Sequence, residues 1–442
     1  MKSKSTVPSM TVDVTSLADT ASFESKTYAK VGRRLIPFLM LCYLGAYLDR
    51  VNVGFAKLQM LNDLRFSETV YGFGAGIFFL GYFLFEVPSN LMLHKVGARN
   101  WLARIMLTWA LISASFVFVK TPTTFYVLRF LLGVAEAGFA PGVILYLTYW
   151  FPSARRAKAL SLFFMAIPLA GIVGGPLSGY ILHAFHGVQG LAGWKWLFML
   201  EALPSLLLGV AILLYLDNGI AAAKWLTDAE KALLSRNVAN DNAHKVAHVS
   251  IRSFIGDGRL WLMAAIYFCV VLGQYGLTFW LPTIIRKSGV ADPLWVGIFT
   301  AIPYLCAIIA LPLVGASADR HRERRLHLAI PMLVSAAGFA TLPMLGGVGA
   351  SLVCVSVAAA GILASSSQFW SLPTALLGGM SAAAGIAAVN CFANLAGFFS
   401  PAIVGWLNDL TGKSTAGLIF ISVAIVIGAA LVFLVPAKTV NR

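Results

Sequence analysis

The chain has 442 residues, of which 59% are hydrophobic and only 12% are charged, and its mean hydropathy is +0.81. Soluble globular proteins carry about a quarter charged residues, so this composition excludes two or three soluble domains and favours one polytopic membrane protein. The net charge of +15 does not indicate a nucleic-acid partner, because Lys and Arg lie in short loops between apolar runs and form no basic face.

Residues 1–32 are polar, contain many Ser and Thr, and lack the apolar core of a cleaved signal sequence. We interpret them as a tail that precedes the first membrane span. Twelve apolar segments follow, each long enough to cross about 30 Å of hydrocarbon, and we expect helices because every backbone polar group must be satisfied within its segment. The predicted spans are 34–57, 71–93, 101–119, 124–149, 159–182, 196–216, 260–285, 295–316, 327–346, 350–374, 384–407 and 416–435.

The loops predict both the orientation and the division of the chain. With the N-terminus inside, over two thirds of the 33 Lys and Arg residues lie on the cytoplasmic side, which is a strong positive-inside signal and makes both termini cytoplasmic. A polar central loop separates six spans from six. The predicted parts after the tail are the N-terminal bundle 33–216, the central loop 217–259, the C-terminal bundle 260–436 and the tail 437–442.

Two motifs in the loops support this layout. In the central loop, Thr227 and Glu230 have the spacing of a capping box, which predicts a short surface helix. The loops after spans 2 and 8 repeat one pattern, NLMLHKVGAR and GASADRHRER. They resemble the G-x-x-x-D-R-x-G-R-R signature of the major facilitator superfamily, although the first copy has His94 where the signature has an acid. The resemblance implies an all-α membrane fold of twelve helices in two six-helix halves. The gating residues that it implies are Lys95, Gly97, Arg99, Gly315, Asp319, Arg320 and Arg324.

Few ionisable residues lie within the predicted spans. The acids are Asp49, Glu86, Glu136 and Glu201, and the only bases deeper than a terminal turn are Arg50 and Arg129. A charge at bilayer depth costs several kcal/mol or more, so such residues are candidates for function. All seven histidines lie in loops or at span ends, which leaves little material for an intramembrane metal site.

Helical depth brings some of these charges to one level. At 1.5 Å per residue, Asp49 and Glu136 both lie roughly 20 Å from the inner ends of their spans, near the midplane, and Arg129 shares a helix face with Glu136. An anionic substrate could replace an acid as the partner of an arginine if that acid takes a proton, which is a route to proton–anion symport. The alternative is a static ion pair that locks helices, above all for Glu86 and Glu201, which we place toward span ends.

Uncharged polar residues complete the candidate site. Tyr47 and Tyr82 lie near the charged level of the N-terminal half, and the C-terminal half offers only neutral groups. These are Gln274, Ser365 to Gln368 with Trp370, and the pair Asn390 and Asn394 one helical turn apart. Each can either join helices or contact a ligand.

A narrower resemblance rests on YLDRVNVGFA, GYFLFEVPSN, RFLLGVAEAGFAPG and QYGLTFWLP, which are similar to segments of the anion:cation symporter family. That family couples organic anions, such as sugar acids, tartrate and phthalate, to protons. The resemblance implies Asp49 and Glu136 as proton-coupling carboxylates, and Arg50 and Arg129 as arginines for the anion. The implied cavity contacts are Tyr47, Tyr82, Gln274, Ser367 and Asn390.

We therefore expect a monomeric bacterial inner-membrane carrier that takes up a small carboxylate with protons by alternating access. It would use the proton gradient and no cofactor. The alternative is a proton-driven antiporter or exporter, which the segment GIVGGPLSG at 171–179 favours if it is an antiporter motif and not a packing surface. An enzyme is disfavoured, because the sequence has neither GxxxxGK[ST] nor HExxH and no large soluble domain.

Overall fold

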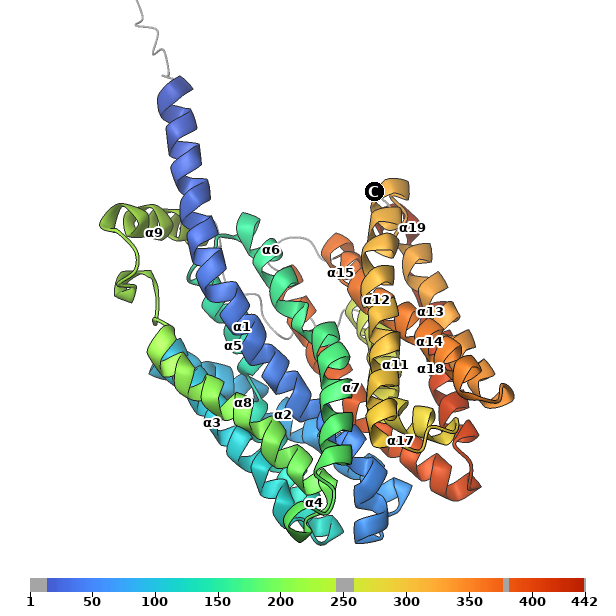
Figure 1. The fold of residues 1–442 in the computed structure, drawn as a ribbon. Helices are drawn as coiled ribbons and strands as arrows, with labels where there is room; N and C mark the ends of the chain where they lie inside the picture. Colours follow the sequence, from blue (N-terminus) through green and yellow to red (C-terminus); the bar gives the residue numbers. More distant parts are fainter. Residues whose placement is uncertain (1–13, 244–257, 377–380, 441–442) are drawn as a thin grey trace, which may run out of the picture.

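The computed structural model describes residues 14–243, 258–376 and 381–440, and every regular element in these ranges is a helix (Figure 1). Twelve of the helical segments are long and apolar enough to cross a membrane, which confirms the predicted fold class. The N-terminal half contains α1 (Val14–Leu64), α2 (Glu68–Val96), α3 (Ala98–Ala114), α4 (Pro122–Glu136), α5 (Phe139–Thr148), α6 (Ser153–Phe164), α7 (Ala166–Ala184) and α8 (Gly193–Tyr215).

The central segment and the C-terminal half follow in chain order. They contain α9 (Asp228–Ala243), α11 (Gly258–Lys287), α12 (Pro293–His321), α13 (Arg325–Thr341), α14 (Val348–Phe369), α15 (Ser371–Leu376), α16 (Ser381–Asn394), α17 (Ala396–Thr411), α18 (Thr415–Val432) and α19 (Ala437–Val440). The short 3₁₀ turns are η1 (Ser115–Phe118), η2 (Val188–Gly190), η3 (Ile220–Ala222) and η4 (Leu342–Met344). Both ends of the described chain lie at the same end of the molecule (Figure 1), which we call the terminal end.

Helix α1 begins far earlier than the predicted span. It has 51 residues, so residues 14–32 of the predicted tail are helical. Helix α9 begins at the predicted capping box, where the Thr227 N–H donates to Glu230 Oε2 (2.8 Å) and the Glu230 N–H donates to Thr227 Oγ1 (3.3 Å). The Lys30 ammonium on α1 contacts Glu230 at 2.8 Å. The terminal part of α1 therefore holds the central helix against the N-terminal half.

Four predicted spans are each broken into two α-helices in the described part of the chain: the fourth into α4 and α5, the fifth into α6 and α7, the tenth into α14 and α15, and the eleventh into α16 and α17. In the fourth span α4 ends at Glu136, and Gly138 has a left-handed backbone with φ +86° before α5 begins. A side chain at Gly138 would also meet the Ser89 side chain, so this turn requires glycine. In the eleventh span α16 ends at Asn394 and α17 begins at Ala396. Broken helices in membrane proteins bring backbone polar groups and side chains to a site near the midplane.

The two halves touch at the end opposite the terminal end, which we call the closed end. There α7 packs on α12, α2 on α17 and α1 on α11. A Cβ on Gly175 would lie 2.6 Å from the carbonyl oxygen of Gly297, and a Cβ on Gly179 would lie 2.5 Å from that of Pro293. Both glycines belong to GIVGGPLSG, so in this structure the segment is a packing surface between the halves.

Candidate functional site

The centre of the candidate site is an ion pair between Arg50 of α1 and Glu136, the last residue of α4. The Arg50 guanidinium donates to Glu136 Oε1, and the two residues are only 7% and 2% exposed. The helix break after Glu136 lets the carboxyl group end α4 and face α1. A buried pair of this kind can be stable only while both charges are present, because either partner alone would be an uncompensated buried charge.

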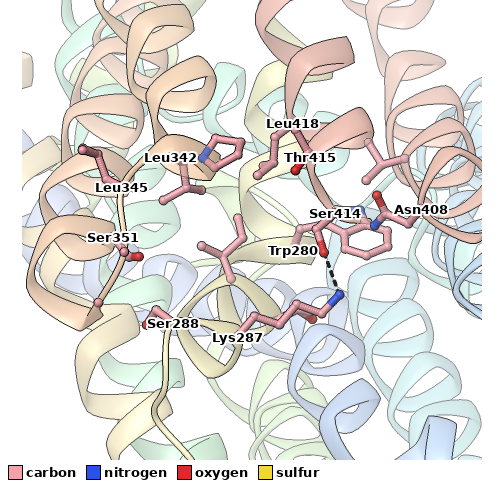
Figure 2. Close-up of a pocket in the computed structure, with 16 residues that line it drawn as sticks. Trp280, Lys287, Ser288, Leu342, Leu345, Ser351, Asn408, Ser414, Thr415 and Leu418 are labelled. Atoms are coloured by element: carbon pink, nitrogen blue, oxygen red, sulfur yellow. Dashed lines mark hydrogen bonds between the residues drawn. The ribbon is translucent and has the colours of Figure 1, made fainter. Parts of the chain in front are cut away.

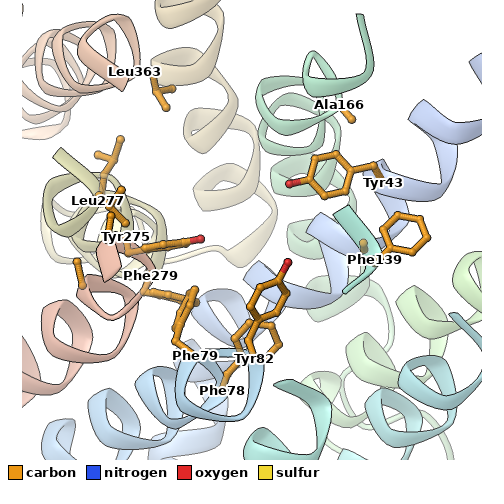
Figure 3. Close-up of a cluster of buried hydrophobic side chains, with 14 of the residues drawn as sticks. Tyr43, Phe78, Phe79, Tyr82, Phe139, Ala166, Tyr275, Leu277, Phe279 and Leu363 are labelled. Carbon is orange, nitrogen blue, oxygen red and sulfur yellow. The ribbon is translucent and has the colours of Figure 1, made fainter. Parts of the chain in front are cut away.

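Aromatic rings surround the Arg50 guanidinium. The centres of the Tyr47, Phe78 and Tyr82 rings lie 5.6, 5.3 and 5.4 Å from its central carbon, close enough for cation–π attraction. From α11 in the other half, the Tyr275 hydroxyl lies 3.5 Å from the guanidinium and accepts a long hydrogen bond. Figure 3 shows the Tyr82 and Tyr275 hydroxyl groups directed toward the same region between the halves.

Tyr275 is a site residue that sequence reasoning missed. Its ring packs on Phe79 at 4.4 Å, and the quoted segment QYGLTFWLP contains it next to the predicted Gln274. The sequence signal that could have identified Tyr275 is a tyrosine within an apolar span, because its buried hydroxyl group needs a hydrogen-bond partner. Tyr275 makes Arg50 a contact point between the two halves.

Asp49 does not share the surroundings of Arg50. Neighbouring residues on a helix point about 100° apart, and Asp49 points into the N-terminal half. Its carboxylate accepts hydrogen bonds from Trp109 Nε1 (3.1 Å), Ser113 Oγ (2.9 Å) and Ser205 Oγ (2.6 Å). The two candidate proton sites therefore have different surroundings. Glu136 pairs with Arg50, whereas Asp49 faces α3 and α8 on another side of α1.

Arg129 does not share the hydrogen-bond partners of Arg50, although the centre of the Phe78 ring lies 5.1 Å from the central guanidinium carbon of Arg129 and 5.3 Å from that of Arg50. It is fully buried, and its guanidinium donates to the backbone carbonyls of Gly74 (3.2 Å) and Ala75 (3.1 Å) on α2. These two bonds join α4 to α2, whereas the buried Nη1 atom of Arg129 has no hydrogen-bond partner among the described residues. Glu86 is half-buried on α2, and its Oε2 atom has no hydrogen-bond partner in the described ranges.

The neutral residues predicted for the C-terminal half lie on three helices. Gln274 is half-buried on α11, Ser367 is exposed on α14, and Asn390 and Asn394 are half-buried on α16. None of their side chains makes a hydrogen bond within the described residues. Their amide and hydroxyl groups are therefore not used to join helices here.

The two gating loops differ in this structure. Gly97 has φ +90° at the junction of α2 and α3, and Arg99 is held by the carbonyl of Leu213 and by Asn218, whose Oδ1 accepts from the Arg99 N–H at 3.1 Å. In the second loop, Gly315, Asp319 and Arg320 lie on α12, and Arg324 precedes α13. Asp319 and Lys95 are exposed, and neither takes part in an ion pair among the described residues.

A second charged cluster, at the closed end, was not predicted. Lys57 is 4% exposed; its ammonium lies 2.5 Å from Glu68 and 3.5 Å from the centre of the Trp280 ring of the other half. Asp409 of α17 accepts from the backbone N–H groups of Glu68 (3.2 Å) and Thr69 (2.7 Å) at the start of α2. These contacts, which we call the Lys57 cluster, tie the halves together.

A pocket of about 250 Å³ lies beside the Lys57 cluster, within the C-terminal half (Figure 2). It is lined by Trp280, Lys287 and Asn408 among others, and Lys287 Nζ donates to Ser414 Oγ at 2.6 Å. None of the predicted site residues lines it. Among the described residues, no group of three or more His, Cys, Asp or Glu side chains could hold a metal ion.

Twelve candidate spanning helices in two halves, with a buried ion pair in the N-terminal half that the other half contacts through Tyr275, define a polytopic transporter. Residues 39–401 match the family model of the Major Facilitator Superfamily, and the chain belongs to that family. Its members are transporters and not enzymes, so the chain carries a small-molecule substrate across a membrane.

Several curated bacterial proteins are similar over almost their whole length. A putative metabolite transport protein NicT of Pseudomonas putida is 48% identical, covering 94% of this chain and 95% of the relative. A putative tartrate transporter of Agrobacterium vitis is 45% identical, with 95% and 93% covered. A quinolone resistance transporter of Acinetobacter baumannii is 41% identical, with 94% and 96% covered.

The solved structures support the fold. A bacterial homologue of the human lysosomal transporter Spinster, in an inward-facing and unoccupied conformation, superposes with a TM-score of 0.75. It covers 93% of this chain and 98% of its own at 17% sequence identity, so it shows the fold alone.

Proposed function

We propose that this protein is a proton-coupled symporter of a small organic carboxylate in the bacterial inner membrane. The observation that carries the proposal is the buried pair of Arg50 and Glu136 at the meeting point of the two halves. The planar guanidinium fork can bind a carboxylate with two hydrogen bonds. A substrate carboxylate can therefore take the place of Glu136 without leaving Arg50 uncompensated.

Displacement of Glu136 supplies the coupling. Once the substrate occupies Arg50, Glu136 is a buried carboxylate without its cation, and it lowers its free energy by taking a proton. Substrate and proton then enter together, and the loaded site carries the charge of the substrate and Arg50 only. Tyr275 of the other half can follow this change directly, because its hydroxyl contacts Arg50.

The closed end supports alternating access. With the predicted orientation, the Lys57 cluster and the glycine contacts between α7 and α12 lie on the periplasmic side. We infer that the structure is a conformation closed to the periplasm, in which Asp319 and Lys95 at the opposite side have no ion-pair partner in the part of the chain that the structure describes. Arg129, held by carbonyls of α2, is not part of the proposed anion contacts.

The test is uptake into proteoliposomes of labelled tartrate, a sugar acid and benzoate, each with an inward proton gradient. We expect one of these classes to accumulate and the accumulation to collapse when an ionophore removes the gradient. Uptake that the ionophore leaves unchanged would overturn proton symport.

The competing function is proton-driven antiport, which the 41% identical quinolone resistance transporter favours. The same vesicles distinguish it, because an antiporter accumulates substrate when the proton gradient points outward. The segment GIVGGPLSG does not by itself favour antiport, because its glycines pack α7 against α12.

A further inference from the structure

A second set of buried polar residues lies inside the N-terminal half, on the side of α1 that faces away from Arg50. It is built by four helices, α1, α3, α7 and α8. We call it the Asp49–Glu201 network, and its members are Asp49, Asn52, Trp109, Ser113, Ser178, Glu201 and Ser205.

Glu201 is the least satisfied carboxyl group of this network. Glu201 is 1% exposed, and because α8 begins at Gly193 it lies deeper in the helix than the predicted position near a span end. Its Oε1 atom accepts from Ser178 Oγ at 2.6 Å, whereas Oε2 has no hydrogen-bond partner among the residues that the structure describes. The fully buried Asn52 lies close enough to interact with Glu201, yet neither polar atom of its amide completes a hydrogen bond.

The network contains two carboxyl groups and no cation. Neither Asp49 nor Glu201 takes part in an ion pair among the described residues. The groups facing them are the Trp109 indole and Ser113 hydroxyl of α3, the Ser178 hydroxyl of α7, the Ser205 hydroxyl of α8 and the Asn52 amide of α1, and all are neutral. Two buried carboxylates without a countercharge repel each other and are poorly solvated, so one of them must be protonated.

Hydrogen bonding indicates which one. Asp49 accepts three hydrogen bonds, which stabilise a carboxylate, whereas Glu201 accepts one. We propose that Glu201 is a second proton-binding residue, protonated in this conformation, which shares its proton with Asp49 during transport. A proton that leaves Glu201 for Asp49 breaks one O–H bond and forms another, and the charge of the network stays the same. The pair then titrates as a unit.

The network is also connected to the surface between the halves. Ser178, which donates to Glu201, lies between Gly175 and Gly179 on α7, the two glycines that pack on α12 of the other half. A movement of α7 away from α12 therefore also moves Ser178, the hydrogen-bond donor that Glu201 has among the described residues. Protonation of Glu201 and opening of the closed end are thereby linked through one helix.

The first test needs neither substrate nor transport. Infrared difference spectroscopy of the full-length protein in lipid nanodiscs, between acidic and alkaline pH, reports the C=O stretch of a protonated buried carboxyl. We expect Glu201→Gln, which keeps the shape, to lose this band and to release one proton fewer in a pH jump followed by an indicator dye. Asp63→Asn is the matched control, because Asp63 is a carboxyl bonded by Trp194 outside the network. An unchanged band in Glu201→Gln would overturn the proposal.

Sodium ions are the competing occupant. The proposal of a bound proton would be overturned in favour of sodium by two results together. NaCl would stabilise the wild type relative to choline chloride but not Glu201→Gln, and the wild type would show no protonated-carboxyl band. If Glu201→Gln fails to fold, Ser178→Ala keeps the carboxyl group and removes its donor. We then expect the band to shift in frequency, and an unshifted band would overturn the assignment.

The transport readout rests on the proposed function. A gradient of one pH unit supports a concentration ratio of about tenfold for each coupled proton, so loss of one coupled proton lowers the accumulation ratio of the substrate about tenfold at that gradient. We expect this loss in Glu201→Gln and not in Asp63→Asn. If no carboxylate accumulates in any variant but the infrared band depends on Glu201, the symport proposal fails and the proton site stands. Equal accumulation in the wild type and Glu201→Gln would overturn the proposal that Glu201 shares a coupled proton with Asp49.

Discussion

The two halves of this transporter have the same number of spans but differ in what they bury. The N-terminal half encloses Arg50, Glu136, Asp49, Glu201 and Arg129 within its helices. The predicted substrate-binding residues of the C-terminal half are uncharged, and this half contacts the ion pair through the Tyr275 hydroxyl, 3.5 Å from the Arg50 guanidinium. The difference indicates a division of work, in which one half carries charge coupling and the other offers neutral contacts and a surface that moves.

The largest expected effect breaks the coupling in the N-terminal half. Glu136→Gln cannot release a proton, so we expect gradient-driven accumulation to be abolished. Counterflow exchange should persist, because the amide can still leave Arg50 free for the substrate. Both are measured in proteoliposomes. Equal loss of accumulation and exchange would show that Glu136 is needed to hold the helices and not to couple protons.

Removal of the arginine is expected to have the next largest effect. Arg50→Ala takes away the anion partner and leaves Glu136 buried without its cation. Truncation of one partner of a buried charged pair costs about 2–5 kcal/mol, so we expect substrate affinity by isothermal titration to fall by that amount. Arg129→Lys is the comparison variant. An equal loss of substrate affinity in Arg129→Lys would show that Arg129 also binds the anion.

The contact surface between the halves offers a test of intermediate size. Gly297→Ala places a methyl group against the backbone of Gly175 and α7. Overpacking of this kind costs about 1–3 kcal/mol, and the cost falls only on the state closed at this end. We expect double electron–electron resonance between spin labels on the two sides of the closed end to report a longer mean distance. Gly349→Ala, which meets no atom within 4 Å, should leave it unchanged.

A smaller effect concerns the contact of the C-terminal half with the ion pair. Tyr275→Phe removes the hydroxyl at 3.5 Å from Arg50 and keeps the ring that packs on Phe79. A hydrogen bond contributes about 0.5–1.5 kcal/mol, and this one is long, so we expect an affinity loss of a few-fold at most. A loss as large as that of Arg50→Ala would make the C-terminal half an equal partner in anion binding.

The smallest effect is a pH dependence at the terminal end. Burial raises the pKa of Glu230, but hydrogen bonds from Lys30 and Thr227 outweigh it and hold the pKa below its ordinary value. The carboxylate form therefore favours docking of α9, and this contribution is complete above the ordinary carboxyl pKa. It is lost as the pH falls through the lowered value.

Exposed ion pairs contribute about 0.2–1 kcal/mol to stability. We therefore expect backbone hydrogen exchange in α9, corrected for intrinsic rates, to be only a few-fold faster once the pH falls below the lowered pKa of Glu230. Glu230→Gln should remove the pH dependence. Persistence of the same dependence in that variant would assign it to another group.

Much of the fold could be predicted from the sequence, because apolar length determines a membrane span and the capping-box spacing determines where α9 begins. The partners within the site could not. Asp49 and Arg50 are adjacent in sequence, and a helix turns them to opposite environments, so only the packing of α3, α4 and α8 decides what each one meets. Arg129 is held by two backbone carbonyls, which carry no sequence signal. Glu201 was placed near a span end because the start of α8 was predicted three residues too late.

The length of α1 has a practical consequence for watching the molecule work. At 1.5 Å per residue its 51 residues extend about 76 Å, from the terminal end past Asp49 and Arg50 to the closed end. A rod of that length magnifies a small tilt, so that a rotation of a few degrees at the ion pair displaces its exposed beginning by several ångströms. A fluorophore on the exposed Phe23 position of α1, replaced by cysteine, would report that displacement far from the site and without touching the bound anion.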